Sequence, residues 1–438
     1  MEQVNQVLEI INIVFSAIVG VAFGFQFIYF LLFWLPKRKY KEATDKHYVG
    51  VFITARNESE VIGRTIKYLQ TKINYPKNKY EIILLADNCD DNTAEIARNL
   101  NGEVKVTVFE RHENDPKKRN VGFALNYLFE QLLPDIDKYD FFIRFDADDI
   151  VDKEYLNKMN DAFSSGVLAA KGYNHATNMS QNMTAGCSAL WYLKDSRFNC
   201  HSRAGLHTYV HLVGGGMMFA ASIIKEDGGW ICTHTSEDTQ FTILNMKKKR
   251  KCRYVPDAIV YEDQPSSLKA LLARFIRMGH SLNHLFWTEG LKCLGRFFIS
   301  FRYWYLDMFL NLVFIPISLL CCTWFPFFYT YMIIYNGVVG NMDIMNTYLI
   351  TLGLVLGCAY FAPTYIQAFL TIILDRKRMK IPVGRQIAIC CIFPLFMMVY
   401  AFSLALGVCT NKQKWGKVTR NVQMVDEKLL KEVDEWNC

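Results

Sequence analysis

The chain has 438 residues, of which 51% are hydrophobic, 14% aromatic and 21% charged, and its formal net charge is +7. This composition excludes a disordered or collagen-like chain. It is too apolar for an average soluble domain and too polar for a pure bundle of membrane helices, so we expect a soluble part and a membrane part. The 13 cysteines are scattered with no CxxC spacing, which argues against a zinc site and a disulfide framework.

The first predicted element is a membrane-spanning helix within residues 1–45. No charged side chain occurs between Ile10 and Leu35. At about 1.5 Å per residue this run spans roughly 39 Å, more than the hydrocarbon core of about 30 Å. A basic cluster at 37–41 follows the run. The positive-inside rule therefore places the N-terminus outside the cell and the next segment in the cytoplasm.

Residues 46–265 alternate short apolar runs with amphipathic helical stretches, as in a doubly wound α/β domain. Loops at the carboxyl ends of the strands bind ligands in such sheets. The predicted strands are Val49–Thr54, Tyr80–Ala86, Val104–Phe109 and Asp140–Phe145, and the predicted helices are Glu58–Lys72 and Thr93–Leu100.

Residues 266–302 mix lysine and arginine with aromatic side chains, which predicts amphipathic helices at the membrane interface. Three further membrane segments are predicted within 303–411, and 412–438 form a charged tail. The three uncharged runs are Met308–Met342, Ile344–Leu374 and Gln386–Asn411.

The basic clusters at 376–380 and 412–420 both favour the cytoplasmic side, although four crossings would place the second one outside. One of the last segments is therefore a candidate for a re-entrant or interfacial helix. Pro326 and Pro394 are the candidate interruptions.

Acidic residues follow two of the predicted strands. Asp87 ends the second strand, where a carboxylate can contact a ligand, whereas Asp91 and Asn92 suit the capping of the next helix. The fourth strand ends in Phe145-Asp146-Ala147-Asp148-Asp149. Three acids held this closely repel one another and usually share a divalent cation, which for oxygen ligands is Mg²⁺ or Mn²⁺.

A second acidic pair, Glu237 and Asp238, precedes a helical run. One interpretation is a helix start with acids in its first turn. The other is that Asp238 is a general base, which deprotonates a hydroxyl nucleophile.

Seven blocks between Tyr48 and about Gly279 occur in an order that resembles the membrane-bound family 2 glycosyltransferases, a group that includes the cellulose, chitin, hyaluronan and poly-N-acetylglucosamine synthases. The resemblance implies a GT-A type nucleotide-diphosphosugar transferase domain, which is an α/β fold, joined to an α-helical transmembrane region. The blocks are VFITARNESEVIGRTI, LLADNCDDNT, GFALNYLF, RFDADDIVDKEYL, GGGMMF, GGWICTHTSEDTQF and EDQPSSLKALLARFIRMGH.

The resemblance implies a role for each matching residue. Thr54, Ala55, Asn57 and Glu58 would line the uridine pocket, and Asp87 would contact uracil.

In the same way, Asp148 would be the direct ligand of Mg²⁺ or Mn²⁺, with Asp146 nearer the ribose and diphosphate. Glu237 and Asp238 would belong to the catalytic motif, with Asp238 as the base. These roles describe an inverting hexosyltransferase that uses a UDP-sugar.

The acceptor side departs from the family pattern. Gly215 and Gly216 match a turn that lines the acceptor cavity, and Arg277 matches an arginine that binds pyrophosphate. However, Arg274 stands where processive members have glutamine, and Met278 stands where they have a tryptophan that stacks under the acceptor sugar.

The leading interpretation is an enzyme that extends a β-linked polysaccharide and passes it across the membrane. A non-processive enzyme that adds one sugar to a lipid acceptor is the alternative, and a catalytically inactive membrane scaffold is a second one. Expected partners are the UDP-sugar, a growing glycan or lipid acceptor, membrane lipids and accessory export proteins, but no nucleic acid. The expected location is a bacterial plasma membrane, with the catalytic domain in the cytoplasm.

Overall fold

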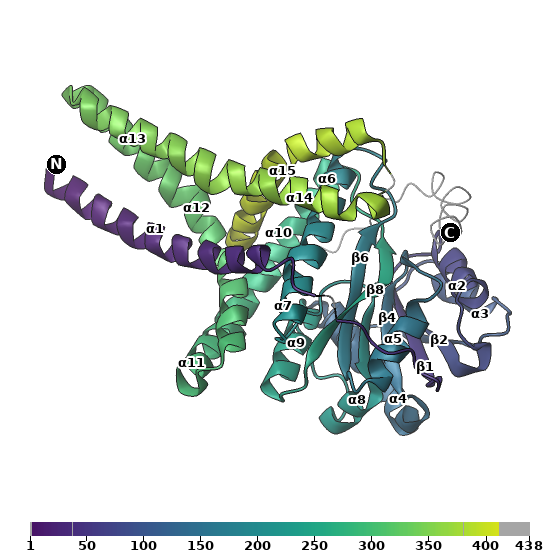
Figure 1. Cartoon of the computed structure of the whole chain (residues 1–438). Helices are drawn as coiled ribbons and strands as arrows, with labels where there is room; N and C mark the ends of the chain where they lie inside the picture. Colours follow the sequence, from purple (N-terminus) through teal and green to yellow (C-terminus); the bar gives the residue numbers. More distant parts are fainter. Residues whose placement is uncertain (1, 37, 380, 411–438) are drawn as a thin grey trace. The chain divides into compact units, whose positions relative to one another are not determined.

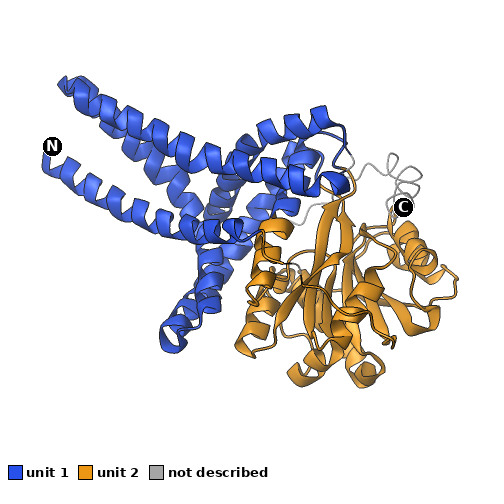
Figure 2. Ribbon diagram, in the orientation of Figure 1, with its two compact units in different colours: residues 1–33, 179–194, 265–414 blue, residues 34–178, 195–264, 415–438 orange. Residues whose placement is uncertain are grey.

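The computed structural model describes residues 2–36, 38–379 and 381–410, which form two compact units (Figure 2). The sheet unit contains the described residues of 34–178 and 195–264, and the helical unit contains those of 2–33, 179–194 and 265–410. The segment predicted as one domain at 46–265 is therefore interrupted at 179–194.

The interruption has a packing cause. Helix α6 (Met183–Lys194) is buried along most of its length. A Cβ at Gly186 in this helix would lie 2.7 Å from Ile389 Cδ1 in the helical unit. The glycine thus permits a close contact between segments about 200 residues apart, which no local sequence pattern indicates.

An eight-stranded sheet forms the centre of the sheet unit, with strand order β3-β2-β1-β4-β7-β6-β8-β5 (Figure 1). The strands are β1 (Val49–Ala55), β2 (Tyr80–Asp87), β3 (Val106–Arg111), β4 (Phe141–Asp146), β5 (Ile150–Val151), β6 (Ala169–Ala176), β7 (Met217–Ala220) and β8 (Cys252–Glu262).

Strands β3, β2, β1 and β4 are parallel, so their carboxyl ends meet at one edge of the sheet. In this register Thr54 pairs with Asp146, and Asp87 pairs with Arg111. Strand β7 runs antiparallel to β4 and begins with Met217 opposite Arg144. The residues that precede β7 therefore lie at the same edge as the ends of the parallel strands.

The four predicted strands are confirmed. Strand β2 is buried along its whole length, which is why residues 82–86 form a continuous apolar run. Strand β6 is also fully buried, but its sequence contains Lys171, Asn174 and His175. Because its pattern is partly polar, β6 is not predicted from the sequence.

Helices cover both faces of the sheet. On one face Phe52, Phe129, Phe142, Phe219 and Trp230 form an aromatic cluster, with ring centroids 5.1 Å apart for Phe129 and Phe142. The α-helices of this unit are α2 (Ile62–Thr71), α3 (Thr93–Arg98), α4 (Val121–Leu132), α5 (Tyr155–Ser164), α7 (His201–Gly205), α8 (Ala221–Asp227) and α9 (Glu237–Lys247).

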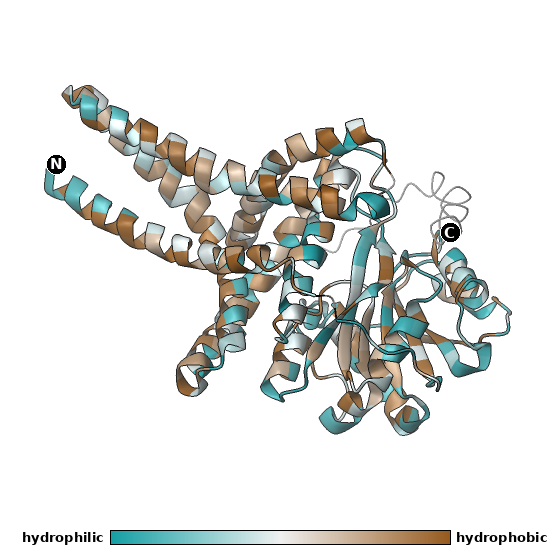
Figure 3. Ribbon diagram, viewed as in Figure 1, coloured by the Kyte–Doolittle hydropathy of each residue, from teal (hydrophilic) through white to brown (hydrophobic). Residues whose placement is uncertain are grey.

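Long apolar helices dominate the helical unit (Figure 3). Among the described residues, four are long and apolar enough to cross a membrane: α1 (Glu2–Leu31), α12 (Tyr303–Val339), the helix Met342–Met379 and α15 (Val383–Cys409). Residues 342–379 comprise α13 (Met342–Leu354), a π-helical turn and α14 (Ala362–Met379). The prediction of four apolar segments long enough to cross a membrane is therefore confirmed for the described residues.

The segment predicted as interfacial is helical. It contains α10 (Leu268–Leu285), a π-helical turn and α11 (Leu291–Ser300). Neither proline named above ends its helix, because α12 continues through Pro326 and α15 continues through Pro394.

Candidate active site

Two loops at the carboxyl edge of the sheet are tied to each other. The Asn57 side-chain oxygen accepts a hydrogen bond from the Asp90 backbone at 2.8 Å, and the Glu58 backbone donates to Thr93 Oγ1 at 2.9 Å. Asn57 itself has a φ of 57°, in the left-handed region that asparagine tolerates better than most residues. The loops after β1 and β2 therefore form one polar wall, which contains Asn57 and Glu58 and follows directly from Thr54 and Ala55.

Asp91 caps the helix after β2, as predicted. Its Oδ1 accepts a hydrogen bond from the backbone of Thr93 at 3.1 Å, and its Oδ2 accepts one from Ser59 at 3.2 Å. Asn92 makes no capping bond through its side chain. The loop conformation therefore depends on Asp91, and only the first of the two expected caps is present.

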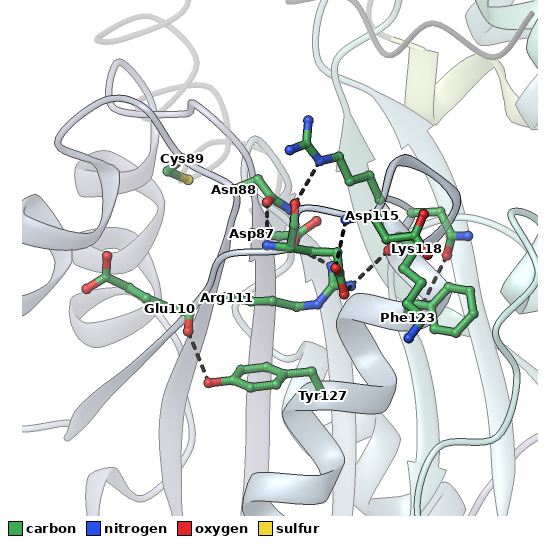
Figure 4. A network of polar contacts seen from close by, with 12 residues as sticks. Asp87, Asn88, Cys89, Glu110, Arg111, Asp115, Lys118, Phe123 and Tyr127 are labelled. Carbon is green, nitrogen blue, oxygen red and sulfur yellow. Dashed lines mark hydrogen bonds and ion pairs between the residues drawn. The ribbon is translucent and has the colours of Figure 1, made fainter.

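Asp87, at the end of β2, is held by an arginine on the neighbouring strand (Figure 4). Arg111 Nη1 lies 2.7 Å from Asp87 Oδ1, and the Asn88 side chain donates to the same oxygen at 2.8 Å. Burial raises the pKa of Asp87, although Arg111 opposes this. Both contacts use Oδ1, so Oδ2 can accept a hydrogen bond from a ligand.

Arg111 also organises the loop after β3. Its Nη2 donates to the carbonyl of Lys118 at 2.8 Å and lies 3.3 Å from Glu113 Oε2 (Figure 4). The sequence analysis missed Arg111. Its position at the end of a parallel strand beside β2 is the signal that would have identified it.

The acidic turn after β4 separates into two kinds of carboxylate. Asp146 and Asp148 are partly exposed, whereas Asp149 is only 2% exposed and its Oδ2 accepts a hydrogen bond from the Asp146 backbone at 2.8 Å. The expectation that all three acids share a cation is therefore wrong for Asp149. The described residues contain no group of three or more His, Cys, Asp or Glu side chains arranged to hold a metal ion.

Asp146 and Asp148 nevertheless suit a divalent cation that also binds the substrate. They supply hard oxygen donors at an accessible strand end, and Mg²⁺ sites of this kind use one or two carboxylates together with substrate phosphates. The fit therefore requires a diphosphate as the source of the remaining ligands.

Asp149 is buried beneath the acidic turn. Burial raises its pKa well above the ordinary value, and the charges of Asp146, Glu262 and Asp148 raise it further. Its Oδ1 is buried without a hydrogen-bond partner in the described part of the chain. A Cβ at Gly215 would collide with the Asp149 carboxyl group, so only glycine fits there.

A buried ion pair connects β4 with the start of α9. Arg144 Nη1 lies 2.5 Å from Glu237 Oε1, and Arg144 Nη2 lies 3.7 Å from Asp146 Oδ1. Burial raises the pKa of Glu237 to about 7, because the loss of solvation outweighs the attraction of Arg144. Sequence analysis missed Arg144, whose partner lies 93 positions away.

Asp238 follows Glu237 in the first turn of α9 and faces the glycine turn before β7. Its Oδ1 accepts a hydrogen bond from the Thr239 backbone at 2.6 Å, and its Oδ2 accepts one from Gly214 at 3.4 Å. Gly214 and Gly216 have φ values of 84° and 72°, which favour glycine. Along this turn Gly214 contacts Asp238, Gly215 lies against Asp149, and the Gly216 carbonyl accepts a hydrogen bond from the Tyr155 hydroxyl.

The remaining predicted residues lie on α10 in the helical unit. Arg274 donates to the Tyr192 hydroxyl, and its guanidinium lies 5.3 Å from the centroid of the Tyr192 ring. Arg277 and Met278 are partly buried on the same helix. They belong to a different compact unit from the acidic edge, so their roles toward the donor and acceptor stay predictions.

A family model described as "Glycosyltransferase like family 2" matches residues 47–280, more than half of the chain. "Probable glycosyltransferase YdaM" of Bacillus subtilis (strain 168) is 26% identical over 308 residues, which cover 66% of this chain and 64% of that protein. The aligned region thus spans less than two thirds of that relative's length.

Two solved structures are similar in fold. The mannosyltransferase PcManGT from Pyrobaculum calidifontis, in complex with GDP-Man and Mn²⁺, is 15% identical with a TM-score of 0.52, covering 93% of this chain and 100% of its own. S. aureus TarS 1–349 in complex with UDP-GlcNAc is 14% identical with a TM-score of 0.36, covering 69% and 90%. The sheet unit has a GT-A-like fold, and the chain belongs to the glycosyltransferase like family 2.

Proposed function

We propose that the protein is an inverting hexosyltransferase that transfers a sugar from a UDP-sugar to an acceptor hydroxyl, with Asp238 as the general base. The observation that carries this proposal is the contact of Arg144 with both Glu237 and Asp146. It joins the acids suited to the donor diphosphate to the helix that carries Asp238. One edge of the sheet therefore holds both halves of a sugar-transfer site.

The donor half supports a nucleotide-diphosphate sugar. Asp87 offers Oδ2 to a base N–H, and the loop residues Thr54, Ala55, Asn57 and Glu58 would contact the nucleoside. Asp148, with Asp146, would hold Mg²⁺ or Mn²⁺, which supplies positive charge to the leaving diphosphate. Arg277 on α10 would add a second positive charge.

The acceptor half supports a single displacement. An alcohol is a poor nucleophile, and a positioned base such as Asp238 contributes typically about 10²–10⁴-fold to the rate. Attack from the face opposite the leaving group inverts the anomeric carbon. An α-linked donor would then give a β-linked product, with Gly215 and Gly216 beside the acceptor.

We favour a membrane lipid as the acceptor. The described residues supply at most four membrane-spanning helices. If four helices of about 10 Å diameter touch in a ring, the central opening is only about 4 Å wide, which is too narrow for a pyranose chain. Met278 also replaces the tryptophan expected under an acceptor sugar in processive enzymes.

Extension and translocation of a β-linked polysaccharide is the second candidate. The apolar helices at 303–339 and 342–379 have 37 and 38 residues, more than one crossing requires. This function would require additional membrane helices around the product, from a second copy or from accessory export proteins. A catalytically inactive scaffold is less well supported, because Asp87, Asp146, Asp148 and Asp238 are all present.

The location that suits this function is a bacterial plasma membrane, with the sheet unit in the cytoplasm. Nucleotide sugars occur on that side, and cysteines remain reduced there. The basic cluster at 37–41, between α1 and the sheet unit, supports the same orientation.

The direct test is nucleotide release by purified protein in detergent with membrane lipids. The donor panel contains UDP-glucose, UDP-N-acetylglucosamine, UDP-glucuronate, UDP-galactose and GDP-mannose. We expect release with one UDP-sugar, and Asp238→Asn should abolish release while UDP still binds. Release with GDP-mannose alone would reassign the donor, and equal loss of release and UDP binding in the variant would make Asp238 structural.

A further inference from the structure

Both sequence flanks of α15 are basic. Arg376, Lys377 and Arg378 lie in the last turn of α14 shortly before α15, and the residues at 412–420 include three lysines and an arginine. The positive-inside rule favours the cytoplasmic side for each flank. A helix that crosses the membrane would place the two flanks on opposite sides.

The first half of α15 packs beside the helix 342–379 over only part of that helix's length. The Tyr365 hydroxyl donates to the carbonyl of Cys391 at 3.3 Å, and the Tyr360 hydroxyl donates to that of Pro394 at 2.6 Å. From Val383 to Pro394 the helix rises roughly 17 Å, about half of a hydrocarbon core of about 30 Å.

The second half of α15 packs on α10, and both halves contact α6. The ring of Tyr400 lies 4.7 Å from that of Phe275 and 5.5 Å from that of Trp191, measured between centroids. Further along, a Cβ at Gly279 would lie 2.8 Å from Leu404 Cα. Glycines at the crossing thus bring the backbones of α10 and α15 together.

The cytoplasmic position proposed for the sheet unit extends to helix α10. The helix begins six positions after the last residue of β8, so its start lies within about 20 Å of the sheet unit. It also carries Arg274 and Arg277, and an arginine at the bilayer centre costs about 2.5–3.5 kcal/mol on the insertion scale. The end of α15 that packs on α10 therefore lies near the same membrane face.

The other three long helices behave differently (Figure 1). These helices contact one another at the ends that lie far from the cytoplasmic ends of α1 and α14. There Tyr331 donates to Asn5 at 3.1 Å and Tyr348 donates to Glu9 at 2.6 Å. Helix α15 does not accompany them to that end in the figure. Tyr360 is a residue of the 342–379 helix that contacts α15. Roughly 30 Å of helix separates Tyr360 from the turn at Gly340.

We propose that α15 is a re-entrant helix, which enters the cytoplasmic leaflet and returns to the cytoplasmic face. The chain then crosses the membrane three times, through α1, α12 and residues 342–379. The outer face of α15 contacts the acyl chains of one leaflet. Its exposed apolar side chains form a stripe at helical spacing: Ile387, Ile392, Leu395, Met398, Phe402 and Leu406. The inference rests on the cytoplasmic position proposed for the sheet unit.

Epitope accessibility in spheroplasts tests the crossing number. Three full-length versions carry an epitope at the C-terminus, at the N-terminus, or after Asn101 in an exposed loop of the sheet unit. We expect antibody to stain the N-terminal epitope in intact spheroplasts, and the other two only after permeabilisation.

Two contrary results are distinguishable. A C-terminal epitope that is stained in intact spheroplasts, while the epitope after Asn101 is not, would overturn the re-entrant helix and leave the proposed function intact. Staining of the epitope after Asn101 in intact spheroplasts would instead contradict the cytoplasmic location of the sheet unit.

Discussion

Arg144 and Glu237 form a buried ion pair, with 2.5 Å between Nη1 and Oε1, that joins β4 to α9. Removal of one partner from a buried pair costs about 3–5 kcal/mol, because the other charge is left uncompensated. We expect Arg144→Met to lower the free energy of unfolding in detergent by about that amount. Arg144→Met combined with Glu237→Gln should recover most of the loss. A double variant as unstable as the single one would mean that the pair is not the cause.

The raised pKa of Glu237 predicts a pH dependence of stability. Burial raises this pKa from about 4.5 to about 7, so the folded protein binds more protons than the unfolded chain between these pH values. The contribution of Glu237 to the free energy of unfolding is therefore fully present below pH 4.5 and is lost as the pH rises to about 7.

Glu237→Gln removes the titrating group, so the slope of unfolding free energy against pH should become shallower between about 4.5 and 7. A residual slope of the same sign is expected from Asp87 and Asp149, whose pKa values burial also raises. An unchanged slope in the Gln variant would contradict the assignment.

The acidic turn offers a matched pair of variants. Asp148→Asn should remove Mn²⁺- or Mg²⁺-dependent sugar transfer, because it deletes an accessible anionic ligand. Asp149→Asn should retain most of the transfer, because Asp149 is buried and its Oδ2 already accepts a hydrogen bond from the Asp146 backbone. Metal titrations of nucleotide release check both variants. Undiminished turnover of the wild type in EDTA would rule out a metal requirement.

We expect nucleobase recognition to depend on the Asp87–Arg111 pair. A hydrogen bond to a charged group contributes about 1.5–3 kcal/mol, so Asp87→Asn should weaken UDP binding by about 10- to 100-fold. Asp137→Asn is the control, because Asp137 is an exposed carboxylate that pairs with Lys225 and has no part in the proposed site. Calorimetric titration with UDP compares the two variants. Equal affinities would remove Asp87 from the nucleotide site.

The parallel half of the sheet was predictable from the sequence for a physical reason. Strands such as β1 and β2 are buried on both faces, so each contains an apolar run with polar residues directly after it. The acids at Asp87 and Asp146 were found because they end such strands.

The antiparallel half was not predictable in this way. Buried polar side chains in β6 depend on partners from distant segments, as when Lys171 Nζ lies 3.8 Å from Asp195 Oδ2 and Asn174 donates to Glu262. Arg144 was not predictable for the same reason, because its burial depends on the ion pair with Glu237. Such pairs can be identified only from the folded structure.

In the proposed reaction Asp238 directs transfer of one sugar from the donor to a membrane lipid. Chromatography of the radiolabelled product, made from the donor selected by the panel, is the sharpest test. We expect a single organic-soluble product with a β linkage, which is absent with Asp238→Asn. Label in a water-soluble polymer, or in an α-linked product, would contradict it.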